Sequence, residues 1–260
     1  MAKGKSTKRH RSSRKRFDKP MQRLILGVLV LVLLGGVYFV QKRYHGLERI
    51  FHYNISLGLN YPVRGIDVSK FNRKIDYKKV ADDGYTFVYI KSSEGNTGRD
   101  PMFRKNVDRA SKAGLKVGAY HFFRMNLDGA VQARNFLASV KGVHLDLPLV
   151  IDVEDWGNAP VSRAVVNQRL RDCVKTIKDA GRSVMIYTNG DGKKRYYDVS
   201  CKGVDLWLCT FSDPDDVKDK GHVMQQYSHW GRVDGINGNV DLDVFMGSRR
   251  EWNDWLDRVK

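Results

Sequence analysis

The 260-residue sequence has few cysteines and histidines, and neither type is grouped. Cys173, Cys201 and Cys209 form no Cys-x-x-Cys pair, and no two of the seven histidines stand at the spacing of metal ligands. We therefore expect no metal site and no cofactor. At least one thiol must stay unpaired. Cys201 and Cys209 could form a disulfide in an oxidising compartment, whereas buried free thiols are the commoner arrangement.

Acidic residues are too few to balance the basic ones: 29 Asp and Glu stand against 46 Lys and Arg, a formal net charge of +17. About half of the excess lies in residues 1–23, which hold ten basic residues and one acid. Because this segment precedes an apolar run, the pattern indicates a membrane protein and no nucleic-acid partner. The smaller excess in the rest of the chain would suit an acidic polymer such as a cell wall, or would simply favour solubility.

The apolar run covers residues 24–40, which are 17 residues without a charge. At about 1.5 Å per residue a helix of this length spans roughly 25 Å, just enough to cross the hydrocarbon core of a membrane. A cleaved signal peptide would have a shorter apolar core and a cleavage site of small residues, and residues 41–44 (QKRY) contain no such site. We therefore predict an uncleaved transmembrane anchor over residues 24–41.

The basic flank also predicts orientation and domain boundaries. Positive charge is retained on the cytoplasmic side, so residues 1–23 should form a cytoplasmic tail. Residues 42–63 are then a linker, and residues 64–260 form a domain outside the cytoplasm, in the periplasm or at the cell surface.

Short apolar runs alternate with amphipathic stretches from residue 64 onward. Predicted strands are residues 64–69, 86–91, 116–123, 148–153, 183–188, 204–209 and 223–228. Predicted helices are residues 76–83, 101–113, 128–140 and 162–180. This alternation favours a parallel sheet covered by helices, and about seven or eight strands favour a closed β/α barrel. Helices become scarce after residue 190, so hairpins or loops should connect the later strands.

Acidic residues stand near the ends of three predicted strands, where barrels of this kind gather their chemistry. Asp67 belongs to the first of these strands, Asp152 and Glu154 to the second, and Asp241 and Asp243 to a third at residues 239–245. Simpler roles are open for two of them. Asp67 could cap a turn, and Asp243 could be an exposed strand residue.

Asp152 and Glu154 carry the most information, because residues i and i+2 of a strand point to the same face. Two carboxyls placed together among apolar neighbours cannot both ionise easily, so one pKa should rise. A protonated acid beside a carboxylate is what cleavage of a glycosidic bond requires. Asp155 is better explained as a surface or capping residue.

Aromatic residues near the same strand ends could stack on sugar rings, although many of them should pack in the core. The candidates are Tyr89, Tyr120, Phe122, Trp156, Tyr187, Trp207 and Tyr227. Tyr120 and Tyr187, at predicted strand ends, are the best of these. Trp252 and Trp255 should instead anchor the last helix.

Six ordered blocks make the sequence resemble the glycoside hydrolase family 25 lysozymes, or Chalaropsis-type muramidases. The blocks are GIDVS (65–69), FVYIKSSEG (87–95), DPMFRKN (100–106), AGLKVGAYHFFR (113–124), LVIDVE (149–154), and QYS (226–228) with GINGNVDLDVF (235–245). The resemblance runs from about residue 64 to residue 256. Each block alone is weak, but their order and spacing are specific.

The resemblance implies an irregular, flattened β/α barrel and hydrolysis of the β-1,4 bond between N-acetylmuramic acid and N-acetylglucosamine in peptidoglycan. Glu154 matches the family's proton donor, and Asp152 the acid that stabilises the transition state or the substrate's acetamido group. Asp67 and Asp241 match the other two acids of the cleft. Attack by the acetamido oxygen or directly by water both remain open. The expected substrate contacts are Tyr89, Glu94, Tyr120, Phe122, Tyr187 and Gln226.

The chain departs from the family pattern where Lys70, Phe71, Asn72 and Arg73 replace the usual Trp-Gln-Gly, which puts the local sugar contacts in doubt. All four acids are present, so we expect an active enzyme. Two alternatives stay open: a hydrolase of chitin-like N-acetylglucosamine polymers, and a wall-binding protein without activity.

Overall fold

The computed structural model describes residues 28–29, 31–39, 61–217 and 221–260. The chain divides into two compact units, residues 1–50 and residues 51–260. In the first unit, residues 28–29 and 31–39 are helical, and no helix within the described residues combines the length and apolar character needed to cross a membrane. The rest of the predicted anchor, and most of the predicted linker, lie outside the described residues.

The second unit contains a sheet that closes on itself. Its strand order is β1-β9-β8-β7-β6-β5-β4-β2-β3, and an additional pairing of β1 with β2 closes eight strands into a barrel, with β3 outside the ring. The strands are β1 (Arg64–Val68), β2 (Phe87–Glu94), β3 (Gly98–Arg99), β4 (Lys116–Phe122), β5 (Leu149–Asp152), β6 (Val184–Asn189), β7 (Asp205–Cys209), β8 (Met224–Gly231) and β9 (Val240–Phe245). The predicted closed barrel is confirmed.

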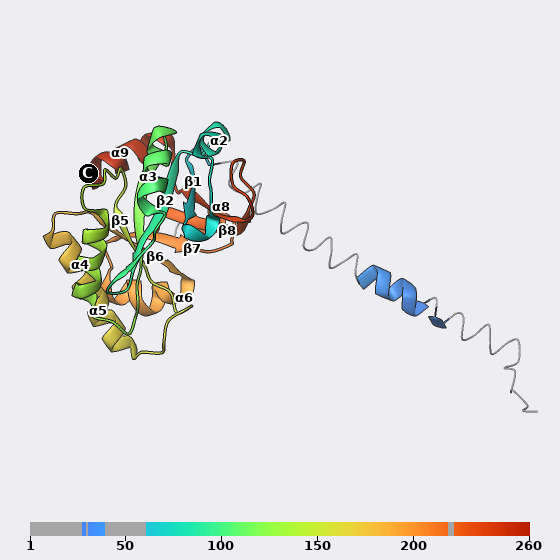
Figure 1. Cartoon of the computed structure of the whole chain (residues 1–260). Coiled ribbons are helices and arrows are strands. Elements are labelled where there is room, and N and C mark those ends of the chain that lie inside the picture. Colours follow the sequence, from blue (N-terminus) through green and yellow to red (C-terminus); the bar gives the residue numbers. More distant parts are fainter. Residues whose placement is uncertain (1–27, 30, 40–60, 218–220) are drawn as a thin grey trace, which may run out of the picture. The chain divides into compact units, whose positions relative to one another are not determined.

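Helices lie around the strands (Figure 1). They are η2 (Lys70–Asn72), α2 (Tyr77–Asp82), α3 (Phe103–Lys112), α4 (Gly129–Val140), α5 (Arg163–Asp179), α6 (Gly190–Gly192), the π-helix η3 (Lys193–Tyr197), α7 (Asp198–Ser200), α8 (Pro214–Val217) and α9 (Arg249–Val259). The four predicted helices correspond to α2, α3, α4 and α5. Between β6 and β9 the described helices have at most five residues, in line with the scarcity of helical patterns there.

The prediction of a parallel sheet is wrong for β9. Strands β1, β2 and β4 to β8 pair in parallel, but β9 is antiparallel to both of its neighbours, β8 and β1. Only residues 232–239 connect β8 to β9, and this is too short for the crossover that a parallel pair requires. The chain therefore turns back in a hairpin, and the start of β9 lies at the edge where the parallel strands end.

The strands are buried on both faces, and successive side chains alternate between two cores. Val88 and Ile90 of β2 pack outward against the helices, whereas Phe87 and Tyr89 point into the interior of the barrel. Trp252 of α9 stacks on Phe87, with 5.4 Å between ring centroids. The last helix is therefore anchored by its tryptophans, as predicted.

The folded domain begins slightly earlier than expected. Tyr61 packs against the outer core, and Val63 is fully buried in the inner one. The carbonyl of Val63 also accepts a hydrogen bond from the backbone N–H of Phe245 at 3.0 Å. Residues 61–63 thus belong to the domain and not to the linker predicted over residues 42–63.

Candidate active site

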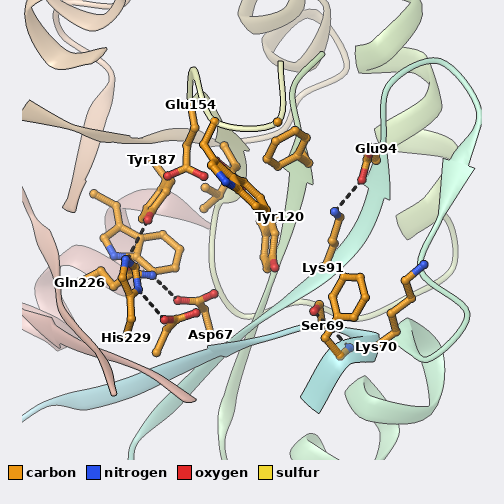
Figure 2. Close-up of a pocket in the computed structure, with 18 of the residues that line it drawn as sticks. Asp67, Ser69, Lys70, Lys91, Glu94, Tyr120, Glu154, Tyr187, Gln226 and His229 are labelled. Atoms are coloured by element: carbon orange, nitrogen blue, oxygen red, sulfur yellow. Dashed lines mark hydrogen bonds and ion pairs between the residues drawn. The ribbon is translucent and has the colours of Figure 1, made fainter. Parts of the chain in front are cut away.

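An open cavity of about 790 Å³ lies at the mouth of the barrel, where the parallel strands end (Figure 2). Five of the residues around it are acids, contributed by β1, β2, β5, the segment after β5, and β9. They are Asp67, Glu94, Asp152, Glu154 and Asp241. The four acids predicted to be catalytic therefore meet in one place.

Asp152 and Glu154 both line this cavity, as their i, i+2 spacing predicts. Asp152 is the last residue of β5, and Glu154 follows two residues later. Asp152 is buried, with 7% of its surface exposed, and its Oδ1 has no hydrogen-bond partner in the described structure. Glu154 is less buried and its side chain points into the open part of the cavity (Figure 2).

Asp67 is held in place by a chain of hydrogen bonds and does not cap a turn. Gln226 donates from Nε2 to Oδ2 of Asp67 at 2.7 Å, and the hydroxyl of Tyr187 donates to Oε1 of Gln226 at 2.8 Å. The turn after β1 is capped by Ser69 instead. Gln226 and Tyr187 thus position an acid in addition to lining the cavity.

Asp241 stands next to Asp67 across the antiparallel pair of β1 and β9. Nδ1 of His229 lies 2.6 Å from Oδ1 of Asp241, and His229 also lines the cavity. His229 was missed by the sequence analysis, which considered histidines only as metal ligands. Its position directly after the QYS block was the available signal.

Three of the five acids of this cavity, Asp67, Asp152 and Glu154, resist ionisation. Burial raises the pKa of Asp152 well above its usual value, and the neighbouring charges of Glu154 and Asp67 raise it further. Burial also raises the pKa of Glu154, and the neighbouring His229 opposes this rise. The pKa of Asp67 is raised by burial and by Asp241. We expected one raised pKa in the Asp152–Glu154 pair, but burial raises both, and neighbouring acids raise each of them further.

A model of the family described as Glycosyl hydrolases family 25 matches residues 66–236, which carry most of this barrel and three of its four clustered acids. The chain belongs to glycosyl hydrolase family 25. It is therefore a glycoside hydrolase.

Relatives of this family 25 hydrolase come from several bacteria. The uncharacterised protein YegX of Escherichia coli O157:H7 is 32% identical over 228 residues, which cover 84% of this chain and 82% of YegX. The autolytic lysozyme of Clostridium acetobutylicum is 32% identical over 183 residues, covering 70% of this chain and 56% of that protein. The structure of a family 25 glycosyl hydrolase from Bacillus anthracis matches with a TM-score of 0.67 at 29% identity, covering 75% of this chain and 93% of that one.

Glu94 differs from Asp67, Asp152 and Glu154 because it forms ion pairs, with Lys91 and Arg124. Burial alone would raise its pKa, but hydrogen bonds from Lys91 and Arg124 lower the pKa below the usual value. Lys91 donates from Nζ to Oε2 of Glu94 at 2.7 Å, and the Arg124 guanidinium donates to Oε1. Glu94 is therefore a fixed carboxylate and has no proton to give.

Aromatic side chains form much of the cavity wall. Trp156 and Phe71 are 80% and 78% exposed, so their ring faces are open to a ligand. The other aromatic residues that line the cavity are Tyr120, Phe122, Tyr187 and Trp207. Phe71 lies in the segment that departs from the family pattern, and the structure places an aromatic ring in the cavity wall there.

Two of the aromatic candidates do not line the cavity. Tyr89 is fully buried, with its ring centroid 4.9 Å from that of Trp207, so its assignment as a substrate contact is wrong. It fits there because Gly118 has no side chain: a Cβ at that position would lie 2.2 Å from the Tyr89 ring. Tyr227 is buried among the outer core residues.

Three other predictions have clear outcomes. Asp243 is fully buried and accepts a hydrogen bond from Nε1 of Trp207 at 3.1 Å, so it is not an exposed strand residue. Asp155 lies outside the cavity lining and accepts hydrogen bonds from Tyr196, at 2.7 Å, and from Arg195. All three cysteines are free, so Cys201 and Cys209 form no disulfide.

Proposed function

We infer that this family 25 hydrolase is a lysozyme that cleaves the β-1,4 bond between N-acetylmuramic acid and N-acetylglucosamine in peptidoglycan. The observation that carries the inference is the meeting of Asp152 and Glu154 in an open cavity that raises the pKa of both. The autolytic lysozyme among its relatives supports the same substrate.

Glu154 acts as the proton donor because it is the less buried of the two acids and faces the open cavity. Its proton passes to the glycosidic oxygen as the bond from that oxygen to C1 of N-acetylmuramic acid breaks. The oxygen keeps the bonding electron pair and leaves as a hydroxyl of N-acetylglucosamine. Water then supplies a hydroxyl group to C1 and returns a proton to Glu154, either directly or after the acetamido oxygen has bonded to C1.

Positive charge develops at C1 as the bond breaks, and the other acids stabilise it. Asp152 lies beside Glu154 and is placed to orient the acetamido group of the substrate. Asp67 and Asp241 face the same cavity from the opposite strands, and the hydrogen bond from Gln226 fixes Asp67 before substrate arrives. Trp156 and Phe71 provide exposed faces on which sugar rings stack.

The experiment that tests the activity replaces the proton donor. Glu154→Gln keeps the shape of the side chain but has no carboxyl proton, so kcat should fall by about 10²–10⁴-fold. Release of soluble fragments from purified peptidoglycan, with mass spectrometry of the new reducing ends, measures the rate and identifies the bond.

Asp155→Asn is the matched control, since Asp155 is the next residue and does not line the cavity. This variant should keep most of the activity. Equal activity of Glu154→Gln and the wild type would refute the role of Glu154. Faster cleavage of chitin oligomers than of peptidoglycan would refute the proposed substrate, and binding to cell walls without cleavage would refute catalysis.

We also propose that residues 24–41 anchor the enzyme in the cell membrane, with residues 1–23 in the cytoplasm and the catalytic domain outside it. The uncharged run of residues 24–40 and the ten basic residues before it support this orientation. Large apolar side chains at described positions within residues 28–39 are 46–70% exposed, which suits contact with lipid. Anchoring would hold the enzyme next to the wall that it cleaves.

A further inference from the structure

A second cavity, of about 430 Å³, adjoins the catalytic cavity and shares five lining residues with it. The shared residues are Lys70, Phe71, Lys91, Glu94 and Arg124. The rest of the wall comes from the hairpin between β2 and β3, and from Asp100 and Leu127. We call this second cavity the side cavity. The side cavity therefore lies directly beside the cleft in which the glycan would bind.

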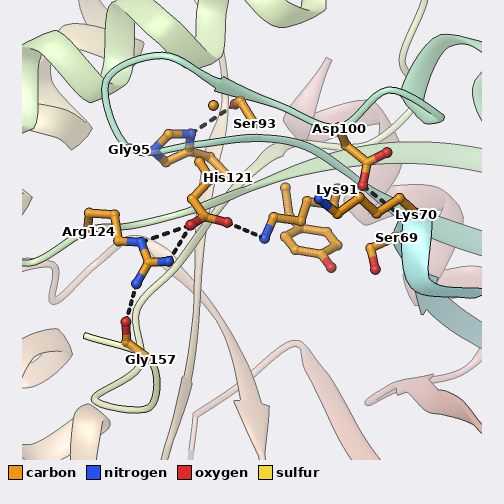
Figure 3. Close-up of polar contacts among 12 residues, drawn as sticks. Ser69, Lys70, Lys91, Ser93, Gly95, Asp100, His121, Arg124 and Gly157 are labelled. Carbon is orange, nitrogen blue, oxygen red and sulfur yellow. Dashed lines mark hydrogen bonds and ion pairs between the residues drawn. The ribbon is translucent and has the colours of Figure 1, made fainter.

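Basic residues outnumber acids in the side cavity by four to two. Both acids are already occupied by partners from the chain. Glu94 lies between Lys91 and Arg124, which point toward one another in Figure 3. Asp100 accepts backbone N–H groups from Lys70 and Met102, each at 2.8 Å. Glu94 therefore neutralises Lys91 and Arg124 in part, whereas the other two basic residues form no ion pair with either acid.

Those two residues are Lys70 and Arg99, and neither forms an ion pair with a carboxylate of the described chain. The ammonium of Lys70 lies 5.2 Å from the ring centroid of Phe71. The Arg99 guanidinium donates to the carbonyl of Gly98 and to the side-chain oxygen of Asn135, both of which are uncharged. Both side chains are exposed, so two cations of the side cavity are available to an anion from solution.

The lining favours an anionic branch over another sugar. Phe71 is the one aromatic residue of the side cavity, whereas the catalytic cavity has six. Sugar rings need stacking faces, and carboxylates need cations and N–H donors. In peptidoglycan, the lactyl group of N-acetylmuramic acid carries a short peptide with free carboxylates, so anions branch from the glycan at regular intervals.

We propose that the side cavity binds a carboxylate of the peptide attached to N-acetylmuramic acid, with Lys70 and Arg99 as the anion-binding groups. This inference rests on the proposed lysozyme function and extends it to the class of substrate: glycan that carries its peptides is preferred over glycan from which they have been removed. Lys70 also stands where the family usually has an aromatic residue. The preference is therefore expected of this chain and not of the family in general.

Binding to Glu154→Gln, whose turnover should be strongly reduced, tests the proposal directly. The first ligand is the disaccharide N-acetylglucosaminyl-N-acetylmuramic acid with a tetrapeptide on its lactyl group. The second is the same disaccharide without the peptide, which exposes the lactyl carboxylate instead. Isothermal titration calorimetry should give a lower Kd for the first ligand, and 0.5 M salt should reduce the difference because it screens exposed charges.

Lys70→Gln and Arg99→Gln, each added to Glu154→Gln, should weaken binding of the tetrapeptide ligand about fivefold, and the triple variant should weaken it further. Binding of the peptide-free ligand should change less. Arg99→Lys keeps the charge and should retain most of the affinity. Lys178→Gln is the matched control, because Lys178 is an exposed lysine of α5 outside both cavities. Thermal unfolding of each variant checks that the fold is intact.

The proposal would be overturned if the two ligands bound with equal affinity. It would also be overturned if the Lys70 and Arg99 variants lost equal affinity for both ligands. Equal losses would assign Lys70 and Arg99 to the lactyl carboxylate or to the glycan. If the wild type cleaves peptidoglycan but the Lys70 and Arg99 variants bind both ligands normally, only the anion-binding role of the side cavity is refuted. If the protein cleaves no peptidoglycan but binds the tetrapeptide ligand through Lys70 and Arg99, only the lysozyme function is refuted.

Discussion

Carboxyl groups in and below the active site are buried more deeply than carboxyls usually are, and their surroundings disfavour charge. Asp67, Asp152 and Asp243 all have a pKa well above the usual value, in each case because of burial first and neighbouring acids second. A group whose pKa is higher in the folded than in the unfolded state stabilises the fold only while it stays protonated. The active site therefore makes the domain less stable as the pH rises.

Asp243→Asn should remove part of this pH dependence. Asparagine keeps an oxygen that can accept the hydrogen bond from Nε1 of Trp207 but cannot ionise. The wild type retains the contribution of Asp243 below the unfolded pKa of about 3.9 and loses it as the pH rises through the higher folded pKa. The Tm of the variant minus that of the wild type should therefore grow between pH 4 and pH 8. The growth should be about 2–4 °C for each kcal/mol of stability that the wild type loses through Asp243.

Asp257→Asn serves as the control for that series, because the side chain of Asp257 is 75% exposed. Its Tm should follow that of the wild type at every pH. A difference for Asp243→Asn that is constant or shrinks with pH would show that Asp243 is ionised in the folded protein.

His229→Gln should move the pH profile of the enzyme. His229 opposes the rise in the pKa of Glu154, so its removal should raise that pKa further. A general acid works while it is protonated, and the alkaline limb of kcat/KM should therefore shift to higher pH. Hydrolysis rates at low substrate concentration, measured between pH 4 and pH 9, give the limb. His144→Gln is the control, because His144 is exposed and lies outside the cavity lining, and it should leave the alkaline limb in place. A shift of the alkaline limb to lower pH in His229→Gln would contradict the assigned effect of His229 on Glu154.

At the scale of elements, the reversal of β9 completes the active site. Asp241 is the second residue of β9, and the antiparallel register places it opposite Asp67 of β1. Like charges directly opposite one another destabilise a sheet, and here His229 and Gln226 offset the repulsion. A parallel β9 would have carried Asp241 to the other end of the barrel.

Helices α4 and α5 pack closely enough to require a glycine. A Cβ at Gly129, the first residue of α4, would lie 1.7 Å from the backbone oxygen of Arg169 in α5. Gly129→Ala should therefore lower the free energy of unfolding by about 1–3 kcal/mol, although alanine is the better helix former. Urea denaturation measures the loss. Gly190→Ala, at the first residue of α6 with open space around the new Cβ, should change stability by less than about 0.5 kcal/mol. Similar stabilities of the two variants would show that α5 can move away.

At the scale of the whole molecule, we predict that residues 24–41 decide where the enzyme resides. The full chain should stay in the membrane fraction after an alkaline carbonate wash, since an uncharged run of 17 residues is long enough to span the hydrocarbon core. Deletion of residues 1–41 should release a soluble protein that still cleaves peptidoglycan. Fractionation with immunodetection and the fragment-release assay measure the two properties.

Deletion of residues 1–20 alone is the matched control, because it removes most of the basic tail and keeps the apolar run. This protein should remain in the membrane fraction. A mature protein whose first residue lies beyond residue 41, identified by mass spectrometry, would show that the run is a cleaved signal peptide and would end the anchor proposal.

Most of the barrel follows from local patterns in the chain. The four amphipathic stretches became α2 to α5, and the apolar runs became strands whose ends lie within three residues of the predicted ones. Tyr89 shows where such patterns fail. It has the residue type and strand position of a sugar contact, but its direction depends on the neighbouring Gly118, which leaves space for the ring inside the barrel. His229 and Phe71 were not predicted to line the cavity, because neither the position of His229 after the QYS block nor the departure at residues 70–73 says which way a side chain points.

The sequence by itself determined the class of fold, the four catalytic candidates and the apolar run, since each depends on periodicity, spacing or composition within a short segment. Only the tertiary structure decided that β9 runs antiparallel, that the pKa of both Asp152 and Glu154 rises, and that Lys70 and Arg99 share a cavity beside the cleft. These properties depend on burial and on distances between residues far apart in the chain. Electrostatic energies and steric fit are set by those distances, and no local pattern contains them.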